Sequence, residues 1–121
     1  CDMLHTLPPR SVLLAAGETT VTLAGESGAG GRNQECALAA LSALSPSECF
    51  LSLASDGSDN SDHAGGIADT LTRAHAVAAS LDPETCLTRH CSYDFFTSTG
   101  DAVVTGPTGS NISDMMIGIK E

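Results

Sequence analysis

The residues best suited to chemistry lie in one short stretch, GETTVTLAGESGAGGRNQE. Its glycine-rich middle leads into a predicted helix, and the first turn of a helix presents backbone N–H groups at the positive end of its dipole, which suits an anion. The stretch also carries a guanidinium, two amides and two carboxylates: Arg32, Asn33, Gln34, Glu18 and Glu35. A purely structural strand–loop–helix connection needs fewer polar groups, so the pattern predicts an anion site that includes Gly31 and Arg32.

Two more polar loops follow predicted strands. The loop DGSDNSDHAGG begins directly after the apolar run 49–54 and offers three carboxylates, from Asp56, Asp59 and Asp62. The loop TGPTGSN concentrates hydrogen-bonding side chains and glycines: Thr105, Gly106, Thr108, Gly109, Ser110 and Asn111. Because ligands bind outside the carboxyl ends of the strands in an open α/β sheet, we expect the three loops to share one edge and form one site.

Structural alternatives stay open for each of these loops. Asp59 and Asp62 could cap turns in a solvated acidic loop. Two consecutive turns would explain the glycines and the proline of TGPTGSN. Arg32 could form a surface ion pair with Glu35 or Glu26, which would contribute little. The structural alternative is weakest for Asp56, which directly follows a strand expected to be buried.

Several familiar catalytic motifs are excluded. A Walker A loop needs GK[ST], but Lys120 is the only lysine and stands at the end of the sequence. A GxGxxG fingerprint would need glycine where Asn33 stands, and an EF-hand starting at Asp56 would need glycine at Ser61. Ser27 lacks the closing glycine of a nucleophile elbow.

Composition narrows the possible partners. The 121 residues predict one domain, and 15 acidic against 5 basic residues give a net charge of −10. That charge argues against nucleic acid and against an anionic membrane surface. It also means that an anion bound here needs positive charge from a partner domain or a metal ion.

The cysteines and the hydropathy pattern bear on compartment. Five cysteines without framework spacing favour reduced structural thiols. Cys86, His90 and Cys91 could be imagined as metal ligands, but no second CxxC or HxxxH supports them. No apolar run approaches ~20 residues, so no membrane span is predicted. We expect a cytoplasmic or organellar protein, mitochondria included, that is not secreted.

Periodicity predicts an α/β fold, with three α/β/α layers around a mixed sheet of about six strands. A continuous apolar run at 11–16 predicts a strand covered on both faces, and alternation at 19–24 predicts a half-buried strand. The remaining predictions are helices at 32–44, at 69–80, from 82 and at 92–96, and strands at 49–54, 101–105 and 114–119. Residues 1–10 read as a linker or the remnant of a preceding domain, followed by one domain over 11–121.

Taken in order, GETTVT, GGRNQE, the alanine- and leucine-rich helix, SDG, AGG, GD and TGPTG-N resemble the MOFRL domain. That is the C-terminal domain of type II glycerate kinases, which are also labelled hydroxypyruvate reductases. The resemblance covers about residues 11 to 120. It implies ATP-dependent phosphorylation of D-glycerate, normally to 2-phosphoglycerate, in a cleft shared with a larger N-terminal Rossmann-like domain.

The resemblance assigns site residues by motif: Glu18, Thr19, Arg32, Asn33, Asp56, Thr105, Gly106, Thr108 and Asn111. On this basis we expect Arg32 to contact the glycerate carboxylate or the moving phosphoryl group, and Asp56 to orient or deprotonate the hydroxyl. Glu18 and the TGPTGSN loop would bind substrate or metal–phosphate, with Mg²⁺ candidates Asp56, Asp59 and Asp62. The sequence departs from the family pattern at Asn60, His63 and Cys91.

The lysine that phosphoryl transfer usually needs is absent from these loops and would come from the N-terminal domain. We therefore expect the 121 residues to fold alone without turning over substrate, and homo-oligomers remain open. The alternative is a stand-alone, non-catalytic module that binds a small anion or a partner domain. An oxidoreductase acting on hydroxypyruvate is disfavoured because the sequence has no dinucleotide fingerprint.

Overall fold

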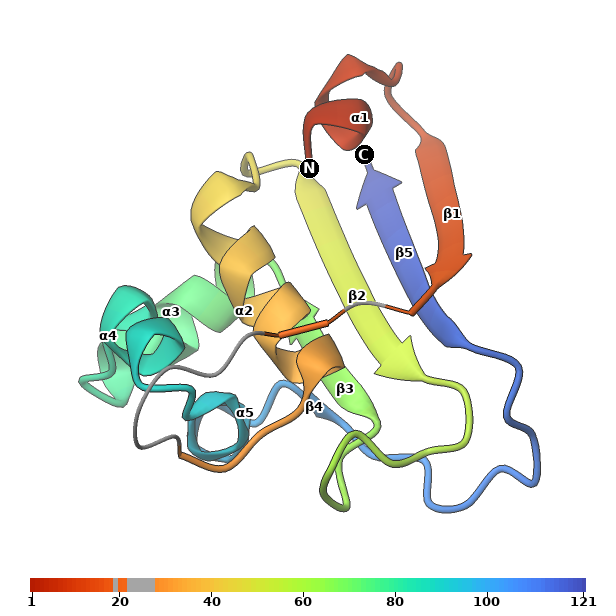
Figure 1. Cartoon of the computed structure of the whole chain (residues 1–121). Coiled ribbons are helices and arrows are strands. Elements are labelled where there is room, and N and C mark those ends of the chain that lie inside the picture. The colour runs from red at the N-terminus through yellow and green to blue at the C-terminus, as the bar shows by residue number, and fades with distance from the viewer. Residues whose placement is uncertain (19, 22–27) are drawn as a thin grey trace.

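The computed structural model describes residues 1–18, 20–21 and 28–121. In this part of the chain, five strands form one sheet in the order β1-β5-β2-β3-β4 (Figure 1). The strands are β1 Ser11–Gly17, β2 Glu48–Ala54, β3 Gly65–Ala68, β4 Ala102–Val103 and β5 Asp114–Lys120. The helices are α1 Asp2–Thr6, α2 Arg32–Ala43, α3 Thr70–Ala78, α4 Pro83–Thr88 and α5 Ser92–Thr99.

The core lies on one face of the sheet. Leu13, Phe50 and Gly118 are cross-strand neighbours on β1, β2 and β5, so their side-chain directions share that face. Leu13 and Phe50 pack against a buried cluster contributed by the helices: Leu4, Leu38, Leu41, Phe95 and Phe96. All five helices therefore contribute to, or pack around, this face through apolar residues.

The opposite face of the sheet carries apolar side chains that the described residues leave uncovered. Val12 and Leu14 on β1 are 59% and 70% exposed, and Ile119 on β5 is 42% exposed. These residues alternate with the core-facing ones, as the period of two requires. The prediction that 11–16 is covered on both faces is therefore wrong within the described residues.

The predicted α/β class is confirmed, but the sheet differs in detail. The five described strands are roughly consistent with the expected six, but their four pairings are all antiparallel rather than mixed. The helices share one core on one face, rather than forming the two outer layers of an α/β/α arrangement. Most of the strand expected at 19–24 lies outside the described residues. Residues 1–10, expected as a linker, contain α1, and its Leu4 is 1% exposed in the core.

One strand was missed because its sequence, GGIA, has no strand signature. Gly65 and Gly66 of β3 pair with Leu53 and Ser52 of β2. A Cβ on Gly66 would lie 2.6 Å from the ring of Phe96, and one on Gly65 would collide with the Ser52 carbonyl oxygen, 1.8 Å away. Gly66 therefore lets α5 pack directly onto the sheet, and Gly65 allows the close approach of β2. From composition alone, this glycine pair would be predicted to lie in a loop.

Local helix signals were read correctly. Asp69 accepts from the backbone N–H groups of Leu71 and Thr72 in a complete capping box at the start of α3. Asp82 caps α4, with Pro83 at the first helical position. No helix among the described residues has the length and apolar character needed to cross a membrane.

Candidate functional site

The N-terminus of α2 already holds an anion, the carboxylate of Asp59. Its Oδ1 accepts from the backbone N–H of Asn33 at 3.1 Å, and its Oδ2 accepts from the backbone N–H of Gln34 at 2.9 Å. These are the donors that an external phosphate or carboxylate would otherwise use. The expected anion site at the helix N-terminus is therefore filled from within the chain.

Asp59 also anchors a buried polar network. The side-chain amides of Asn33 and Gln34 donate to its carboxylate at 3.2 Å each. The Ser52 hydroxyl donates to the side-chain oxygen Oδ1 of Asn33 at 2.7 Å, and the His63 ring nitrogen Nδ1 lies 3.3 Å from Gln34 Oε1. Asn33, Gln34 and Ser52 are fully buried. Such a network, once satisfied, fixes one arrangement of the loop and the helix.

Gly31 has a structural reason for its identity. A Cβ at this position would lie 2.2 Å from the Asp59 carbonyl oxygen and 2.3 Å from the Asp59 carboxylate carbon. Glycine therefore lets Asp59 reach the helix N-terminus. Neither Asn33 nor Asp59 lines the pockets described below, so both belong to the support of the site.

Arg32 points out of the same helix turn and is held by a carboxylate. Its Nε donates to Asp114 Oδ2 at 2.6 Å and its Nη2 donates to Oδ1 at 3.1 Å, while Nη1 lies 3.4 Å from Glu18 Oε1. Asp114 is 1% exposed, whereas 40% of the Arg32 side chain is exposed. Hydrogen bonding to Asp114 raises the pKa of Arg32, so the guanidinium stays charged. Among the described residues, Arg32 pairs with Asp114 and Glu18 rather than with Glu35, one of the two partners of the structural alternative; the other, Glu26, lies outside the described residues.

The predicted loops meet beside Arg32. A pocket of about 200 Å³ is lined by Glu18, Arg32, Ser55, Asp56, Asn111 and Asp114. The backbone N–H of Thr108 donates to the Asp56 carbonyl oxygen at 3.2 Å, and the Thr108 hydroxyl donates to the Ser55 carbonyl. A Cβ on Gly57 would lie 2.0 Å from the Gly106 carbonyl oxygen, so the loops abut at that point. We call this the Asp56 pocket.

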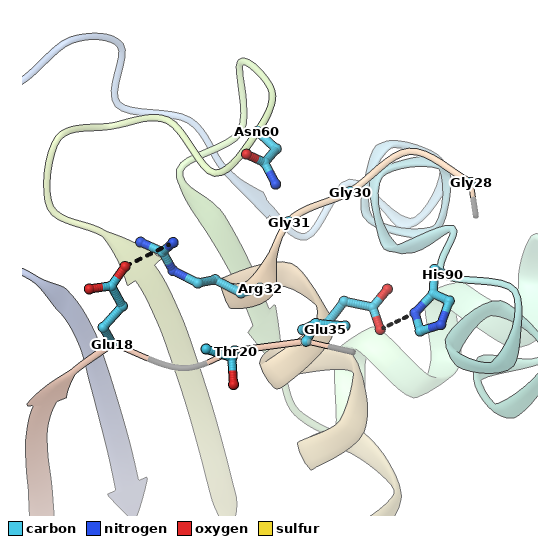
Figure 2. A pocket seen from close by; sticks show the side chains of 10 residues that line it. Glu18, Thr20, Gly28, Gly30, Gly31, Arg32, Glu35, Asn60 and His90 are labelled. Carbon is cyan, nitrogen blue, oxygen red and sulfur yellow. Dashed lines mark hydrogen bonds and ion pairs between the residues drawn. The ribbon is translucent and has the colours of Figure 1, made fainter. Parts of the chain in front are cut away.

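A second pocket lies on the other side of Arg32. It has a volume of about 280 Å³ and is lined by Glu18 and Arg32 (Figure 2), which also line the Asp56 pocket. Its remaining walls come from the glycine segment, which is Gly28, Gly30 and Gly31, and from five further residues: Thr20, Val21, Glu35, Asn60 and His90. Glu35 Oε2 lies 3.4 Å from His90 Nδ1. We call this the Glu35 pocket.

The other predicted residues are less central. Thr19 lies outside the described residues. Thr105, Thr108 and Gly109 are exposed, and the positive φ angles of Gly106 (65°) and Gly109 (74°) show that the turns require these glycines. From the TGPTGSN loop, Asn111 reaches the Asp56 pocket.

Sequence reasoning missed Asp114 and left His90 outside the site. Asp114 stands 82 residues after Arg32 and begins a mostly apolar strand, so only its buried position in β5 reveals the pairing. His90 follows α4 with a φ of 51° and was considered only beside Cys86 and Cys91.

The predicted magnesium ligands do not converge. Asp56 Oδ1 accepts from the Ser58 backbone N–H at 3.0 Å, and the Asp59 carboxylate accepts a hydrogen bond from the N-terminus of α2. Asp62 is exposed, and its hydrogen bond raises the pKa of Tyr93. In the described ranges, no three His, Cys, Asp or Glu side chains are placed to hold a metal. These residues do not fit an all-protein Mg²⁺ cage, and the idea that Cys86, His90 and Cys91 bind a metal gains no support from them.

The sequence pattern of the MOFRL family matches residues 11–114. The chain belongs to the MOFRL family. It is 41% identical to the glycerate 2-kinase of Pyrococcus horikoshii over 113 residues, which is 92% of this chain and 26% of that protein. It is 41% identical to the D-glycerate 2-kinase of Thermotoga maritima over 112 residues, which is 90% of this chain and 27% of that protein.

The family resemblance extends to three dimensions. The crystal structure of the glycerate kinase from Thermotoga maritima superposes with a TM-score of 0.89 at 39% identity, covering 96% of this chain and 28% of that one. The MOFRL chain therefore spans about a quarter of the length of these relatives.

Proposed function

We propose that this MOFRL chain forms one wall of the active site of an ATP-dependent glycerate kinase that converts D-glycerate to 2-phosphoglycerate. The other wall would come from an N-terminal Rossmann-like domain. The activities for which the relatives are named support the reaction class, and the greater length of the relatives supports a shared site.

The observation that carries the proposal is the position of Arg32 between two pockets. Asp114 accepts two hydrogen bonds from the Arg32 guanidinium, while the exposed part of the Arg32 side chain faces both pockets. A guanidinium matches the geometry of a carboxylate, so Arg32 would bind the carboxylate of glycerate. Holding it rigidly lowers the entropic cost of positioning the substrate.

Asp56 would act on the reacting hydroxyl. It lines the same pocket as Arg32, and one of its carboxylate oxygens is fixed by the Ser58 backbone N–H. A carboxylate in this position can orient a hydroxyl and accept its proton as the phosphoryl group transfers. Glu18, which is 73% exposed and close to Arg32, would contact the substrate from the open side.

The described residues do not themselves form a phosphate cradle. Lys120 lies beside Glu48 and His5 at the opposite end of β5 from Asp114. The N-terminus of α2 donates its hydrogen bonds to the Asp59 carboxylate. We therefore assign the nucleotide phosphates and their magnesium ion chiefly to the N-terminal domain. This assignment predicts that the 121 residues alone phosphorylate no glycerate.

The test is an Arg32→Ala variant of the full-length protein, assayed for D-glycerate phosphorylation. We expect kcat/KM to fall by roughly 10²- to 10³-fold or more, because an aligned charge contact is lost. Arg89→Ala is the matched control, because Arg89 is also exposed but follows α4 and lines neither pocket. A mild effect at Arg32, similar to that at Arg89, would make Arg32 structural.

One observation favours the second candidate, a non-catalytic module that binds a partner. The exposed apolar side chains of Val12, Leu14 and Ile119 on the outer face of the sheet are suited to a protein interface. The two candidates differ in the Arg32 assay, because a pure binding module would show no glycerate phosphorylation in the wild-type full-length protein.

A further inference from the structure

Glu35 is a buried carboxylate whose hydrogen bonding is incomplete. The residue is 7% exposed, and Oε1 has no hydrogen-bond partner among the described residues. The other oxygen, Oε2, lies 3.4 Å from His90 Nδ1. A buried polar atom without a partner costs free energy, so such an atom in a pocket wall calls for a donor that the pocket can supply.

The position of Glu35 links it to Arg32. The two residues are three apart on α2, which places them on the same side of the helix. Figure 2 shows Arg32 extending toward Glu18 and Glu35 extending toward His90, with the glycine segment running above both. The Glu35 pocket therefore presents a cation at one end and an acceptor carboxylate at the other.

D-glycerate has three polar arms on one tetrahedral carbon: a carboxylate, a hydroxyl and a hydroxymethyl group. Arg32 is shared by the two pockets, with Asp56 on one side and Glu35 on the other. A carboxylate on Arg32 and a reacting hydroxyl toward Asp56 leave the hydroxymethyl arm to extend toward Glu35. A hydroxyl there would donate to the carboxylate of Glu35, which lines the pocket and whose Oε1 is buried without a hydrogen-bond partner among the described residues.

We infer that Glu35, positioned by His90, is a specificity-determining residue that binds the non-reacting hydroxyl of the substrate, an inference that rests on the proposed function. Three diverging contacts around one carbon distinguish the two enantiomers of a hydroxy acid. The same contacts favour an acid that carries the terminal hydroxyl over one that lacks it.

The experiment compares D-glycerate with D-lactate, which carries a methyl group in place of the hydroxymethyl arm. Dissociation constants for both acids are measured by calorimetry on the full-length protein, and phosphoryl transfer to D-glycerate is assayed in parallel. The variants are Glu35→Gln and His90→Asn, because asparagine tolerates the positive φ of residue 90. Glu84→Gln, at an exposed position on α4, is the matched control.

We expect Glu35→Gln to weaken D-glycerate binding by about tenfold or more and to leave D-lactate binding unchanged, since only one of the two acids has the hydroxyl. His90→Asn should show a smaller loss with the same dependence on the hydroxyl, and it provides the test if Glu35→Gln does not fold. Equal losses for both acids, or no loss for either, would overturn the inference.

The outcomes separate this inference from the proposed function. If the wild-type protein phosphorylates D-glycerate and Glu35→Gln shows no hydroxyl-dependent loss, the kinase proposal stands and the role of Glu35 is refuted. If the hydroxyl-dependent loss appears without any phosphoryl transfer, the binding role stands and the kinase proposal fails. If the wild-type protein binds neither acid, both are refuted.

Discussion

Arg32 and Glu35 flank Asn33 and Gln34 in sequence, yet the structure divides the four residues into two pairs with different roles. Asn33 and Gln34 point inward, are fully buried, and bond to Asp59 through both backbone and side chain. Arg32 and Glu35 lie on the pocket side of the same turn. The 3.6-residue helical period accounts for the division, because residues three apart share a side of the helix and the two between them face elsewhere.

The difference teaches how four consecutive polar residues can both stabilise the fold and leave groups free to bind a ligand. The inner pair uses its hydrogen-bonding capacity on the fold, so it has little left for a ligand. The outer pair keeps capacity in reserve: Arg32 is 40% exposed and Glu35 has an oxygen without a partner among the described residues. Changes to the inner pair or to Asp59 should therefore affect stability, and changes to the outer pair should affect binding.

The strongest way to test this division is Asp59→Ala. The change removes the acceptor for two backbone N–H groups and two side-chain amides, all buried. Leaving such donors unsatisfied should lower the free energy of unfolding by about 3–5 kcal/mol. That is a large share of the about 5–15 kcal/mol that stabilises a typical domain. Urea unfolding of the 121-residue chain, followed by circular dichroism, measures the loss.

Glu18→Gln provides the contrast on the pocket side. Glu18 is 73% exposed and its pair with Arg32 is solvent-accessible, so stability should change by no more than about 0.5 kcal/mol. If Asp59→Ala proved as mild as Glu18→Gln, the buried network would not support the fold and the division of α2 would be wrong.

A smaller effect is expected from Asp114→Asn, which tests the pair between the buried carboxylate of Asp114 and the pocket-lining guanidinium of Arg32. Asparagine keeps the size of Asp114 but removes the charge that holds Arg32, so we expect a loss of about 1–2 kcal/mol in stability. In the full-length protein the KM for D-glycerate should also rise, because the guanidinium is no longer fixed.

A double-mutant cycle separates positioning from a direct contact. If Asp114 acts through Arg32, Asp114→Asn should have little further effect on KM in an Arg32→Ala background. Asp101→Asn is the matched control, since Asp101 forms a more open pair with His75 and should change stability by at most about 0.5 kcal/mol. Additive effects of Asp114→Asn and Arg32→Ala on KM would contradict the positioning role.

Much of the fold follows from local sequence signals. The caps at Asp69 and Asp82 and the apolar periodicity of α2 predicted helices that the structure contains. The missed features depend on tertiary contacts. β3 has glycines where propensity favours a loop, and only tertiary contacts explain them: the Ser52 carbonyl oxygen at Gly65 and the Phe96 ring at Gly66. The side on which the sheet is covered also depends on where the helices pack, which the sequence pattern of β1 does not reveal.

The candidate site was predictable in outline only. Strand-end reasoning brought Glu18, Arg32, Asp56 and Asn111 to one edge, and they line one pocket. The role of Asp59 was not predictable, because a carboxylate in a loop reads equally well as a metal ligand or as a cap for a distant helix. The Arg32–Asp114 pair joins residues 82 positions apart, a separation that no local pattern encodes.

The last prediction concerns a buried carboxylate at the opposite end of the sheet, and its effect appears only in acid. Burial by itself raises the pKa of Glu48, but hydrogen bonds from Ser45 and His5 outweigh it and lower the pKa from an ordinary 4.5 to about 2. The folded state therefore binds a proton on Glu48 less readily than the unfolded state does. The stability that Glu48 contributes is fully present above about pH 4.5 and is lost as the pH falls toward 2.

Glu48→Gln should flatten the decline of stability across that window, while Glu84→Gln, at an exposed position, should leave the decline unchanged. Urea midpoints measured at several pH values between 2 and 5 provide the comparison. Glu48 also lies 3.6 Å from Lys120, which donates to the His5 carbonyl oxygen, so loss of the negative charge of Glu48 in acid would loosen α1 and the end of β5 together. If the Glu48→Gln protein lost stability in acid as steeply as the wild type, the acid-sensitive carboxylate would lie elsewhere.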